Sequence, residues 1–548
     1  MELQDTPSSR STAERNIDEQ GAIEWKPSSD ELVVMSSLAI LSLMVALDAC
    51  VIVTSLDVIV EDLKTGANGG FWIGTAYLLA NAVAMPFIAD LSEVFGRQSC
   101  LMASLIFFTV GTTLCCLSHG ITQMLVGRSL QGIGGAGIIM LCLVIYTDMV
   151  PLRARPKWYG IVLGAWALGN CAGPIVGGAI AQYTTWRWIF YIMFPFCAVG
   201  MVAVQLRVRL KTRAASVRER LAMIDWAGGL FFTSSATLFL MAVSSGGIQF
   251  AWDSPGTLVP LCLGIAGLLW TFVYETRLSK RPFLDLGLFW GLTPVAIYVC
   301  GALQGLVIYG QLYYIPQFFI LVKGFSPVNT GLALFPVMFT LVPGSIMTGV
   351  LVTRTNNYRY PIWAGWTLTT ASSGLTLLWD ADTPTSIWAP TLVLLGLGHG
   401  AILNAQNFAS QATCRHEAES VAAAMYAFAR QSGMAAGVGV GASVFQNLVK
   451  RHLESVGLPG DSMTGAQVNV AGLLKAATND EARTRMLDAC VLSLRGVYGL
   501  YLGLSGAALL LSLLIKGFDM NRALATKQKL QPSRIDQETS HRQPDAGV

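Results

Sequence analysis

Charged residues are scarce in this sequence. Asp, Glu, Lys and Arg make up 13% of its 548 residues, whereas hydrophobic residues make up 53% and the mean hydropathy is +0.54. Soluble domains contain about 25% charged residues, so a soluble enzyme and a nucleic-acid-binding protein are both excluded. The net charge of +3 is too small to indicate a polyanionic partner. A membrane-spanning helix needs about 20 mostly apolar residues, and the chain has room for a dozen or more.

Several chemical motifs are also missing. The sequence has no Gly-Lys dipeptide, and therefore no phosphate-binding loop that would mark an ATP-driven pump. The 11 cysteines are an odd number and lie mostly inside apolar stretches, so we predict no disulfide framework and no metal site. The segment Gly169-Asn170-Cys171-Ala172-Gly173 mimics a nucleophile elbow, but it lies within an apolar helix. We therefore predict no enzyme activity and no cofactor.

The apolar runs predict an all-α polytopic membrane protein. Residues 1–31 are predicted to be a disordered N-terminal tail, 32–207 a six-helix bundle, and 208–291 a basic linker with two inserted helices. Residues 292–516 form the second six-helix bundle, with a long connection at 449–491, and 517–548 form the C-terminal tail. The fourteen predicted helices lie near residues 33–57, 70–90, 98–118, 122–148, 158–182, 187–206, 225–246, 256–275, 292–320, 328–352, 360–379, 386–411, 419–448 and 493–515.

The basic residues of the short loops predict the orientation. With a cytoplasmic N-terminus, the inner loops contain 16 Lys and Arg residues and the outer short loops contain 3. Inner loops of membrane proteins carry the excess of Lys and Arg, so both termini are predicted to be cytoplasmic and the 449–491 connection extracellular. Two six-helix halves fit a transporter built from repeats, with its site near the midplane between them.

Few ionisable residues lie within the predicted helices. Asp48 is about eight residues from the outer end of the first helix, and Arg128 is about seven residues inside the fourth. At 1.5 Å per residue both lie roughly 10–12 Å below the outer surface and are expected to share one cavity. Asp48 is therefore a candidate proton acceptor whose ionisation is biased by Arg128. The alternative is a permanent ion pair that only joins two helices.

The second half contributes His399 and Arg430 near mid-membrane. His399 is either a titrating group or a hydrogen-bonded packing residue. Arg430 either ties its helix to neighbouring carbonyl groups or takes part in substrate binding or coupling. Composition does not choose between these alternatives.

The glycines of the fifth predicted helix carry the most specific pattern. Small residues at i, i+4 and i+8 let another backbone approach, and a proline bends the helix. The pattern Gly-x-x-x-Gly-Pro-x-x-Gly-Gly is formed by Gly169, Gly173, Pro174, Gly177 and Gly178. It resembles the antiporter motif of the major facilitator superfamily, specifically its fourteen-helix drug:H⁺ antiporter branch as found in fungi.

Two further segments support the resemblance. The stretch 125–134 resembles the family motif in which an arginine, here Arg128, is linked to proton transfer. The stretch 89–98 is similar to the family's loop motif, with Ala89, Glu93 and Gln98 as departures. The resemblance implies a cytoplasmic gate that involves Glu93, Gly96, Arg97 and Asp148.

The resemblance also implies fold and activity. The fold is two six-helix bundles related by a pseudo-twofold axis, with the two extra helices inserted between them. The activity is alternating-access export of a small lipophilic metabolite, toxin or drug against protons, with no obligate protein partner. Family members direct several residues into the cavity, and their counterparts here are Tyr77, Asn81, Trp166, Gln304, Tyr309 and Tyr313. The plasma membrane is the expected location, and a vacuolar or vesicular membrane is the alternative.

Two other functions stay open at this point. A proton-coupled uptake symporter for a nutrient or a chelated metal needs the same protonatable site. A non-transporting receptor on the same fold would bind a solute without moving it. The antiporter motif favours export over uptake by resemblance.

Overall fold

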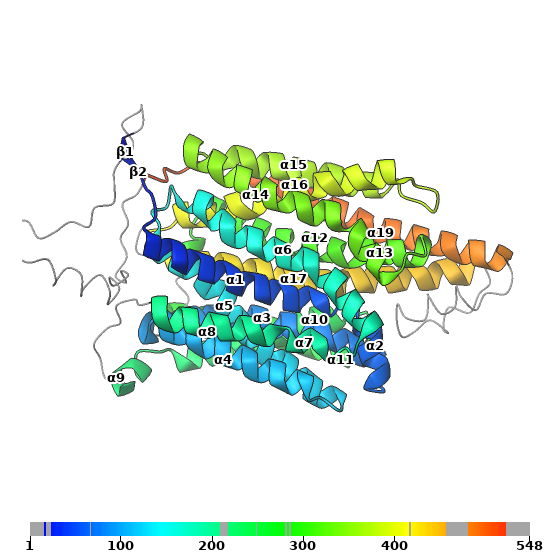
Figure 1. Ribbon diagram of the computed structural model, residues 1–548, viewed down its shortest axis with the longest axis horizontal. Coiled ribbons are helices and arrows are strands. Elements are labelled where there is room, and N and C mark those ends of the chain that lie inside the picture. Colours follow the sequence, from blue (N-terminus) through cyan, green and yellow to red (C-terminus); the bar gives the residue numbers. More distant parts are fainter. Residues whose placement is uncertain are drawn as a thin grey trace, which may run out of the picture.

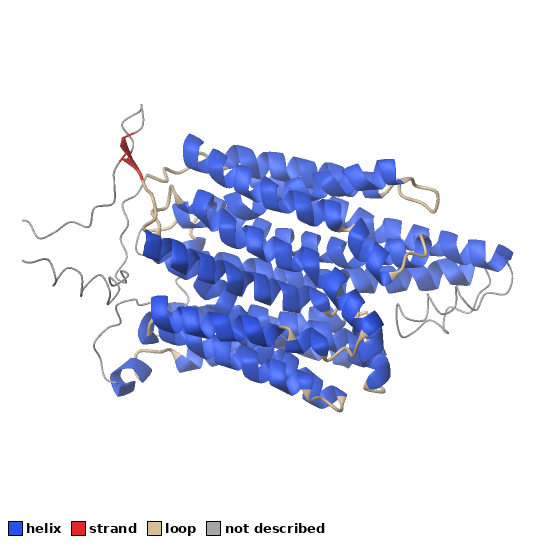
Figure 2. Cartoon of the chain, in the orientation of Figure 1, coloured by secondary structure: helices blue, strands red, loops and turns tan. Residues whose placement is uncertain are grey.

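The computed structural model describes residues 16–17, 23–65, 67–208, 217–247, 249–279, 282–283, 286–415, 418–455 and 480–521. The described chain is almost entirely helical, as Figures 1 and 2 show. Two short strands, β1 (Asn16–Ile17) and β2 (Ile23–Glu24), pair antiparallel. They lie inside the segment 1–31, so the prediction of disorder is wrong for these four residues.

The first bundle contains six long helices. The helix α1 (Ser29–Val51) packs against α6 (Arg155–Tyr183) and α8 (Met193–Arg207). The other three are α3 (Ala67–Phe95), α4 (Arg97–Cys116) and α5 (Ile121–Met149), and both α3 and α4 pack against α5. Two short helices, α2 (Leu56–Asp62) and α7 (Trp188–Tyr191), lie at the end opposite to the start of α1 (Figure 1).

The second bundle repeats this arrangement. The helix α12 (Leu292–Gln317) packs against α17 (Glu419–Ser455) and continues into a π-helical turn, Phe318–Val322. The helix α16 (Thr385–Ala412) packs between α14 (Phe335–Thr355) and α15 (Arg359–Thr376), and α15 also contacts α19 (Asp480–Ser512). A short helix, α13 (Pro327–Ala333), precedes α14.

The inserted segment contains two long helices, α10 (Trp226–Ser245) and α11 (Pro255–Arg277), which pack on each other. A short helix, α9 (Val217–Leu221), precedes them, and a 3-10 turn, Leu286–Phe289, follows. The helix α10 contacts α3 of the first bundle and α17 of the second. The insert therefore flanks the junction of the two bundles, which meet mainly where α6 packs on α14 and α3 packs on α17.

Twelve helical segments of the described chain are long and apolar enough to cross a membrane. The helices α15 and α17, of 18 and 37 residues, run among these segments but are not in that set. Both carry many polar residues, several of them buried against neighbouring helices. The count of fourteen spans stays a prediction.

Two helix boundaries differ from the sequence prediction in ways that matter for function. The helix α1 begins at Ser29 because Ser28 and Glu31 form a capping box, and it ends at Val51 rather than at 57. Asp48 is therefore three residues from the end of α1, not eight. The predicted connection 449–491 is also wrong at both ends, because α17 continues to Ser455 and α19 already begins at Asp480.

The first residues after α19 are docked on the second bundle. The Tyr358 hydroxyl donates to the carbonyl oxygen of Lys516 at 2.8 Å, and the amide of Asn356 donates to Asp519 at 2.7 Å. Met520 is fully buried. The predicted C-terminal tail therefore begins after these contacts, because an apolar anchor and a set of hydrogen bonds hold residues 516–521 against the α14–α15 turn.

Candidate functional site

Asp48 and Arg128 meet inside the first bundle. Arg128 Nη1 donates to Asp48 Oδ2 at 2.9 Å, and the two side chains are 1% and 0% exposed. Asp48 lies in the last turn of α1 and Arg128 in the second turn of α5. A charge pair without access to water is expensive in a membrane unless its remaining polar atoms are also satisfied.

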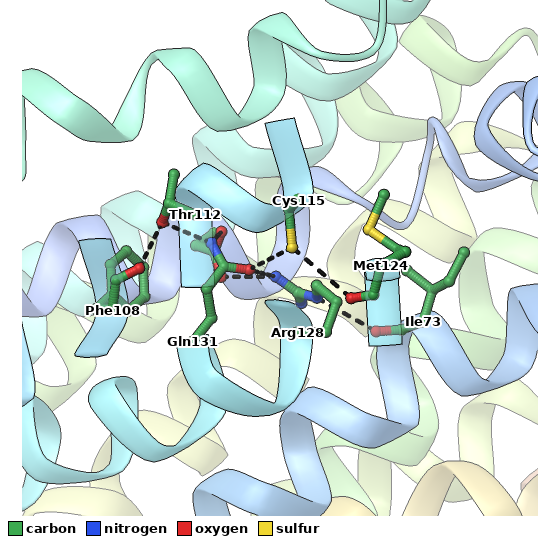
Figure 3. A network of polar contacts seen from close by, with 8 residues as sticks. Ile73, Phe108, Thr112, Cys115, Met124, Arg128 and Gln131 are labelled. Atoms are coloured by element: carbon green, nitrogen blue, oxygen red, sulfur yellow. Dashed lines mark hydrogen bonds and ion pairs between the residues drawn. The ribbon is translucent and has the colours of Figure 1, made fainter. Parts of the chain in front are cut away.

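Neighbouring polar groups supply those contacts (Figure 3). Gln131, one turn along α5, accepts from Arg128 at 2.8 Å and donates to Asp48 Oδ1 at 3.2 Å. Its amide also donates to Thr112 Oγ1 at 2.8 Å, and the Cys115 thiol lies 3.6 Å from its oxygen. Arg128 Nε donates to the carbonyl oxygen of Ile73 at 3.3 Å. Gln131 belongs to the stretch 125–134 that resembles the family motif, and its i+3 spacing places it beside Arg128, but its contact with Asp48 was not predicted.

Two predicted cavity residues of α3 adjoin this network. The Arg128 guanidinium lies over the Tyr77 ring, 4.3 Å from its centroid. Tyr77 and Asn81 are both buried, and the Tyr77 hydroxyl and both Asn81 amide atoms have no hydrogen-bond partner among the described residues. A methyl group on Gly135 would lie 2.9 Å from the Tyr77 hydroxyl and 3.0 Å from Asn81 Nδ2. The two polar groups therefore share one region beside α5.

The glycine motif lies along the contact between α6 and α1. A Cβ atom on Gly169 would come within 2.5 Å of the Leu43 carbonyl oxygen, and one on Gly173 within 2.7 Å of Cys50 Cβ. A Cβ on Gly177 would overlap the carbonyl oxygen of Val51, and Gly178 is buried. These glycines are required because the two backbones touch.

Polar contacts join the same two helices. The Pro174 carbonyl oxygen accepts from Thr54 Oγ1 at 2.9 Å. The Cys50 thiol donates to Asn170 Oδ1 at 2.8 Å, a contact that sequence reasoning did not identify. The end of α1 that carries Asp48 is therefore held tightly against the motif.

The four predicted gate residues lie at the end of the bundles where α1 begins, which we call the termini end. Arg97 Nε donates to Asp148 Oδ2 at 3.1 Å, and Arg97 Nη2 lies 3.6 Å from Glu93 Oε1. Gly96 makes the turn between α3 and α4 with φ of +94°, a conformation that side chains disfavour. The Ser420 hydroxyl of α17 donates to Glu93 at 3.4 Å, so this group reaches the second bundle.

A second contact between the bundles at this end was missed from sequence. Arg155 Nη1 lies 2.7 Å from Glu419 Oε2 and 2.8 Å from Gln411 Oε1, and the Arg155 and Glu419 side chains are 2% and 7% exposed. Arg155 belongs to α6 and Glu419 to α17. Sequence reasoning counted Arg155 only as a loop charge, because its partner lies 264 residues away.

The predicted site residues of the second bundle make fewer polar contacts than those of the first bundle. Gln304 and His399 are fully buried, and neither side chain has a hydrogen-bond partner among the described residues. Tyr313 stacks edge-on with Tyr314, and Tyr309 lies close to Cys50 of the first bundle.

Arg430 lies at the junction of the two bundles. Its guanidinium is over the Trp166 ring of α6, 5.1 Å from the centroid. Arg430 Nη1 has no acceptor among the described residues, and the choice between its two predicted roles stays a prediction.

The opposite end has its own polar cluster. The Trp186 indole donates to Asp62 Oδ2 at 2.8 Å, and Arg187 Nη1 donates to the same oxygen at 3.1 Å. Arg187 also donates to the carbonyl oxygen of Ser118 at 3.1 Å. The Trp186 indole N–H, followed by Arg187, holds the pKa of the Asp62 carboxyl below its usual value.

Comparison with known proteins agrees with this architecture. The family model described as Major Facilitator Superfamily matches residues 38–438. The chain belongs to the major facilitator superfamily. Its structure is similar to the crystal structure of the human organic anion transporter MFSD10 (TETRAN), with a TM-score of 0.57 and 12% identity over 89% of this chain and 100% of that one. At this identity the likeness shows the superfamily fold alone, and the protein is a multi-pass membrane protein.

The sequence relatives are fungal transporters. The "MFS transporter L2" of Phoma sp. is 35% identical over 92% of this chain and 85% of the relative. The "MFS-type efflux pump LUC4" of Fusarium sp. is 31% identical over 94% and 92%, respectively. The "MFS efflux transporter aclA" of Aspergillus oryzae is 35% identical over 77% of each chain. The resemblance to the superfamily and to its fungal efflux pumps is confirmed.

Proposed function

We propose that the protein is a proton-coupled efflux transporter that exports a small lipophilic metabolite, toxin or drug by alternating access. The observation that carries this proposal is the enclosed Asp48–Arg128 pair with its Gln131 support. Protonation of Asp48 removes one charge of the pair, which weakens the tie between α1 and α5. We propose that a proton and a substrate therefore compete for the Asp48–Arg128–Gln131 network.

The direction is proposed from the relatives. Two of the three relatives above carry an efflux name, which favours export over uptake of a nutrient or chelated metal. A transporter also accounts for the unpaired polar groups at the junction better than a non-transporting receptor does, because the two bundles must separate around a ligand. The antiporter glycines hold α6 against α1 within the first bundle, so these two helices are proposed to move together.

The termini end is proposed to be cytoplasmic. It carries Glu93–Ser420 and Arg155–Glu419, and these contacts between the bundles are proposed to close the transporter toward the cytoplasm and to break when it opens inward. We propose the plasma membrane as the location, with a vacuolar or vesicular membrane as the alternative. Fluorescent tagging of the C-terminus in yeast distinguishes them.

The test is the accumulation of a panel of lipophilic compounds in efflux-deficient yeast that express the full chain. Wild type is expected to lower the accumulation of at least one compound, and a protonophore or Asp48→Asn is expected to abolish this effect. Asp30→Asn is the matched control, because Asp30 is exposed and contacts only the exposed Arg207 at 3.4 Å among the ion pairs of the described residues. Export by Asp48→Asn at the wild-type rate over several pH values would refute proton coupling at Asp48.

Raised accumulation under the same controls would indicate uptake. Binding of a compound by the purified protein without any change in accumulation would indicate a receptor.

A further inference from the structure

Four arginine side chains of the described chain are buried: Arg97, Arg128, Arg155 and Arg430. The first three lie 3.1, 2.9 and 2.7 Å from the carboxylates of Asp148, Asp48 and Glu419, respectively. Arg430 is 7% exposed, and no ion pair with it occurs among the described residues. Its Nη1 has no hydrogen-bond acceptor there either.

The charge of Arg430 cannot be removed by proton loss, because a guanidinium stays protonated in proteins. A buried lysine or histidine escapes the cost of burial by becoming neutral, but an arginine requires an anion or a set of acceptors. Within the described residues the structure supplies an aromatic face and no anion. A bound anionic ligand would supply the negative charge that the described residues do not provide.

The surroundings of Arg430 fix its position. A methyl group on Gly305 would overlap the Arg430 carbonyl oxygen, so α17 and α12 are in backbone contact at this level. Tyr309 and Tyr426 lie within electrostatic range of the guanidinium. Gln304, directly before Gly305, has both amide atoms buried without a partner. The region therefore holds one cation and further unsatisfied hydrogen-bonding groups.

We propose that Arg430 and Trp166 form a binding subsite for an organic anion: a carboxylate joined to an aromatic or other flat apolar group. This inference rests on the proposed function and names its substrate class. The guanidinium fork matches the two oxygens of a carboxylate, and the indole face suits a ring. Because Trp166 belongs to the first bundle and Arg430 to the second, the ligand contacts both parts that move in alternating access.

The subsite is also within reach of the proton site. Tyr309 lies within electrostatic range of Arg430, Cys50 and Tyr77. Tyr77 in turn contacts Arg128. Occupation of the subsite therefore acts on side chains that border the Asp48–Arg128 pair.

The test uses three probes that share one ring system and differ in charge: anthracene-9-carboxylate, anthracene-9-methanol and anthracene-9-methylamine in its protonated form. Their dissociation constants are measured by calorimetry on the purified full chain in detergent. Wild type is expected to bind the carboxylate about 10-fold or more tightly than the alcohol, and the ammonium most weakly. Equal binding of carboxylate and alcohol overturns the proposal without any variant.

Variants assign the charge preference to a residue. Arg430→Gln is expected to remove the preference, whereas Arg430→Lys keeps part of it because the charge remains and the fork is lost. Trp166→Leu is expected to weaken the binding of all three probes to the same extent. Arg207→Gln, at an exposed arginine, is the matched control and keeps the wild-type preference. An unchanged preference in folded Arg430→Gln overturns the assignment.

The outcomes separate this inference from the proposed function. Charge-selective binding by a protein that exports nothing supports the subsite and refutes export. Proton-driven export by a protein that binds carboxylate and alcohol equally refutes the subsite and leaves export intact.

Discussion

Arg128 in the first bundle and Arg430 in the second bundle are both buried arginines, and they differ in what compensates the charge. Arg128 has Asp48, Gln131 and the Ile73 carbonyl group around it, together with the Tyr77 ring. Arg430 has the Trp166 ring and no carboxylate among the described residues. Within the part of the chain that the structure describes, the charge of Arg128 is compensated and that of Arg430 is not.

The comparison of these two regions indicates which buried charge contributes to stability and which contributes to ligand binding. A compensated charge stabilises the fold of the resting protein, and it changes only when a proton arrives. An uncompensated buried charge destabilises the resting protein. An anion that binds beside it restores that stability. We therefore expect coupling in the first bundle and substrate selection at the junction with the second.

The largest expected effect comes from removal of one charge at each site. Asp48→Ala leaves Arg128 without its counter-ion and is expected to lower the free energy of unfolding by about 3–5 kcal/mol. Arg430→Met removes an uncompensated charge and is expected to raise it by about 1–4 kcal/mol. Chemical denaturation in mixed micelles measures both. Destabilisation by Arg430→Met would mean that the protein itself compensates Arg430.

Substitution of one glycine in each bundle tests whether the two bundles are alike in backbone packing. A Cβ on Gly177 would overlap the Val51 carbonyl oxygen, and one on Gly433 would overlap the Ala302 carbonyl oxygen. Gly177→Ala and Gly433→Ala are each expected to cost about 1–3 kcal/mol, because the helices must move apart. Gly74→Ala, where a Cβ would meet no heavy atom within 4 Å, is the control. A large difference between the two costs would show that the α1–α6 contact of the first bundle packs differently from the α12–α17 contact of the second.

The two buried glutamines extend the comparison to neutral groups. Gln131 and Gln304 are both fully buried, but Gln131 contacts Arg128, Asp48 and Thr112, whereas the Gln304 amide has no partner among the described residues. Gln131→Leu is expected to cost about 1–3 kcal/mol, since it leaves buried groups unsatisfied. Gln304→Leu is expected to be neutral or stabilising. Equal costs in the same denaturation measurement would contradict the distinction between the two sites.

The smallest effect is expected at Asp62. Its carboxyl is half exposed, and its pKa is lowered chiefly by the Trp186 indole. A lowered pKa contributes stability above the unfolded-state pKa, and this contribution is lost as the pH falls through the folded-state value. Asp62→Asn is thus expected to lower the melting temperature slightly at pH 7 and to approach wild type as the pH falls through the lowered folded-state pKa of Asp62. A larger deficit at acid pH would contradict this sign.

Part of the site was predictable from the sequence because each residue type is rare in its setting. An acidic residue and an arginine within apolar helices are recognisable as site candidates from the sequence, and so is a glycine repeat at helical spacing. The distance of Asp48 from the end of its helix was predicted wrongly, because hydropathy does not reveal that α1 ends at Val51. The contact of Gln131 with Asp48 was not predicted, because it joins two helices that are far apart in the sequence.

Contacts between distant segments were beyond prediction. The Arg155–Glu419 pair joins residues from different bundles, and no periodicity in either helix indicates the other. The same holds for the docking of Met520, which follows the last helix in a stretch without apolar periodicity.

The sequence by itself determined that the chain lies in a membrane, as helices in two halves with an insert. Insertion depends on the summed hydrophobicity of continuous segments, and each such segment satisfies its backbone hydrogen bonds internally. Only the tertiary structure decided which buried charge has a partner. Ion pairing requires two side-chain atoms within a few ångströms of each other, and that distance depends on how helices from distant parts of the chain pack together.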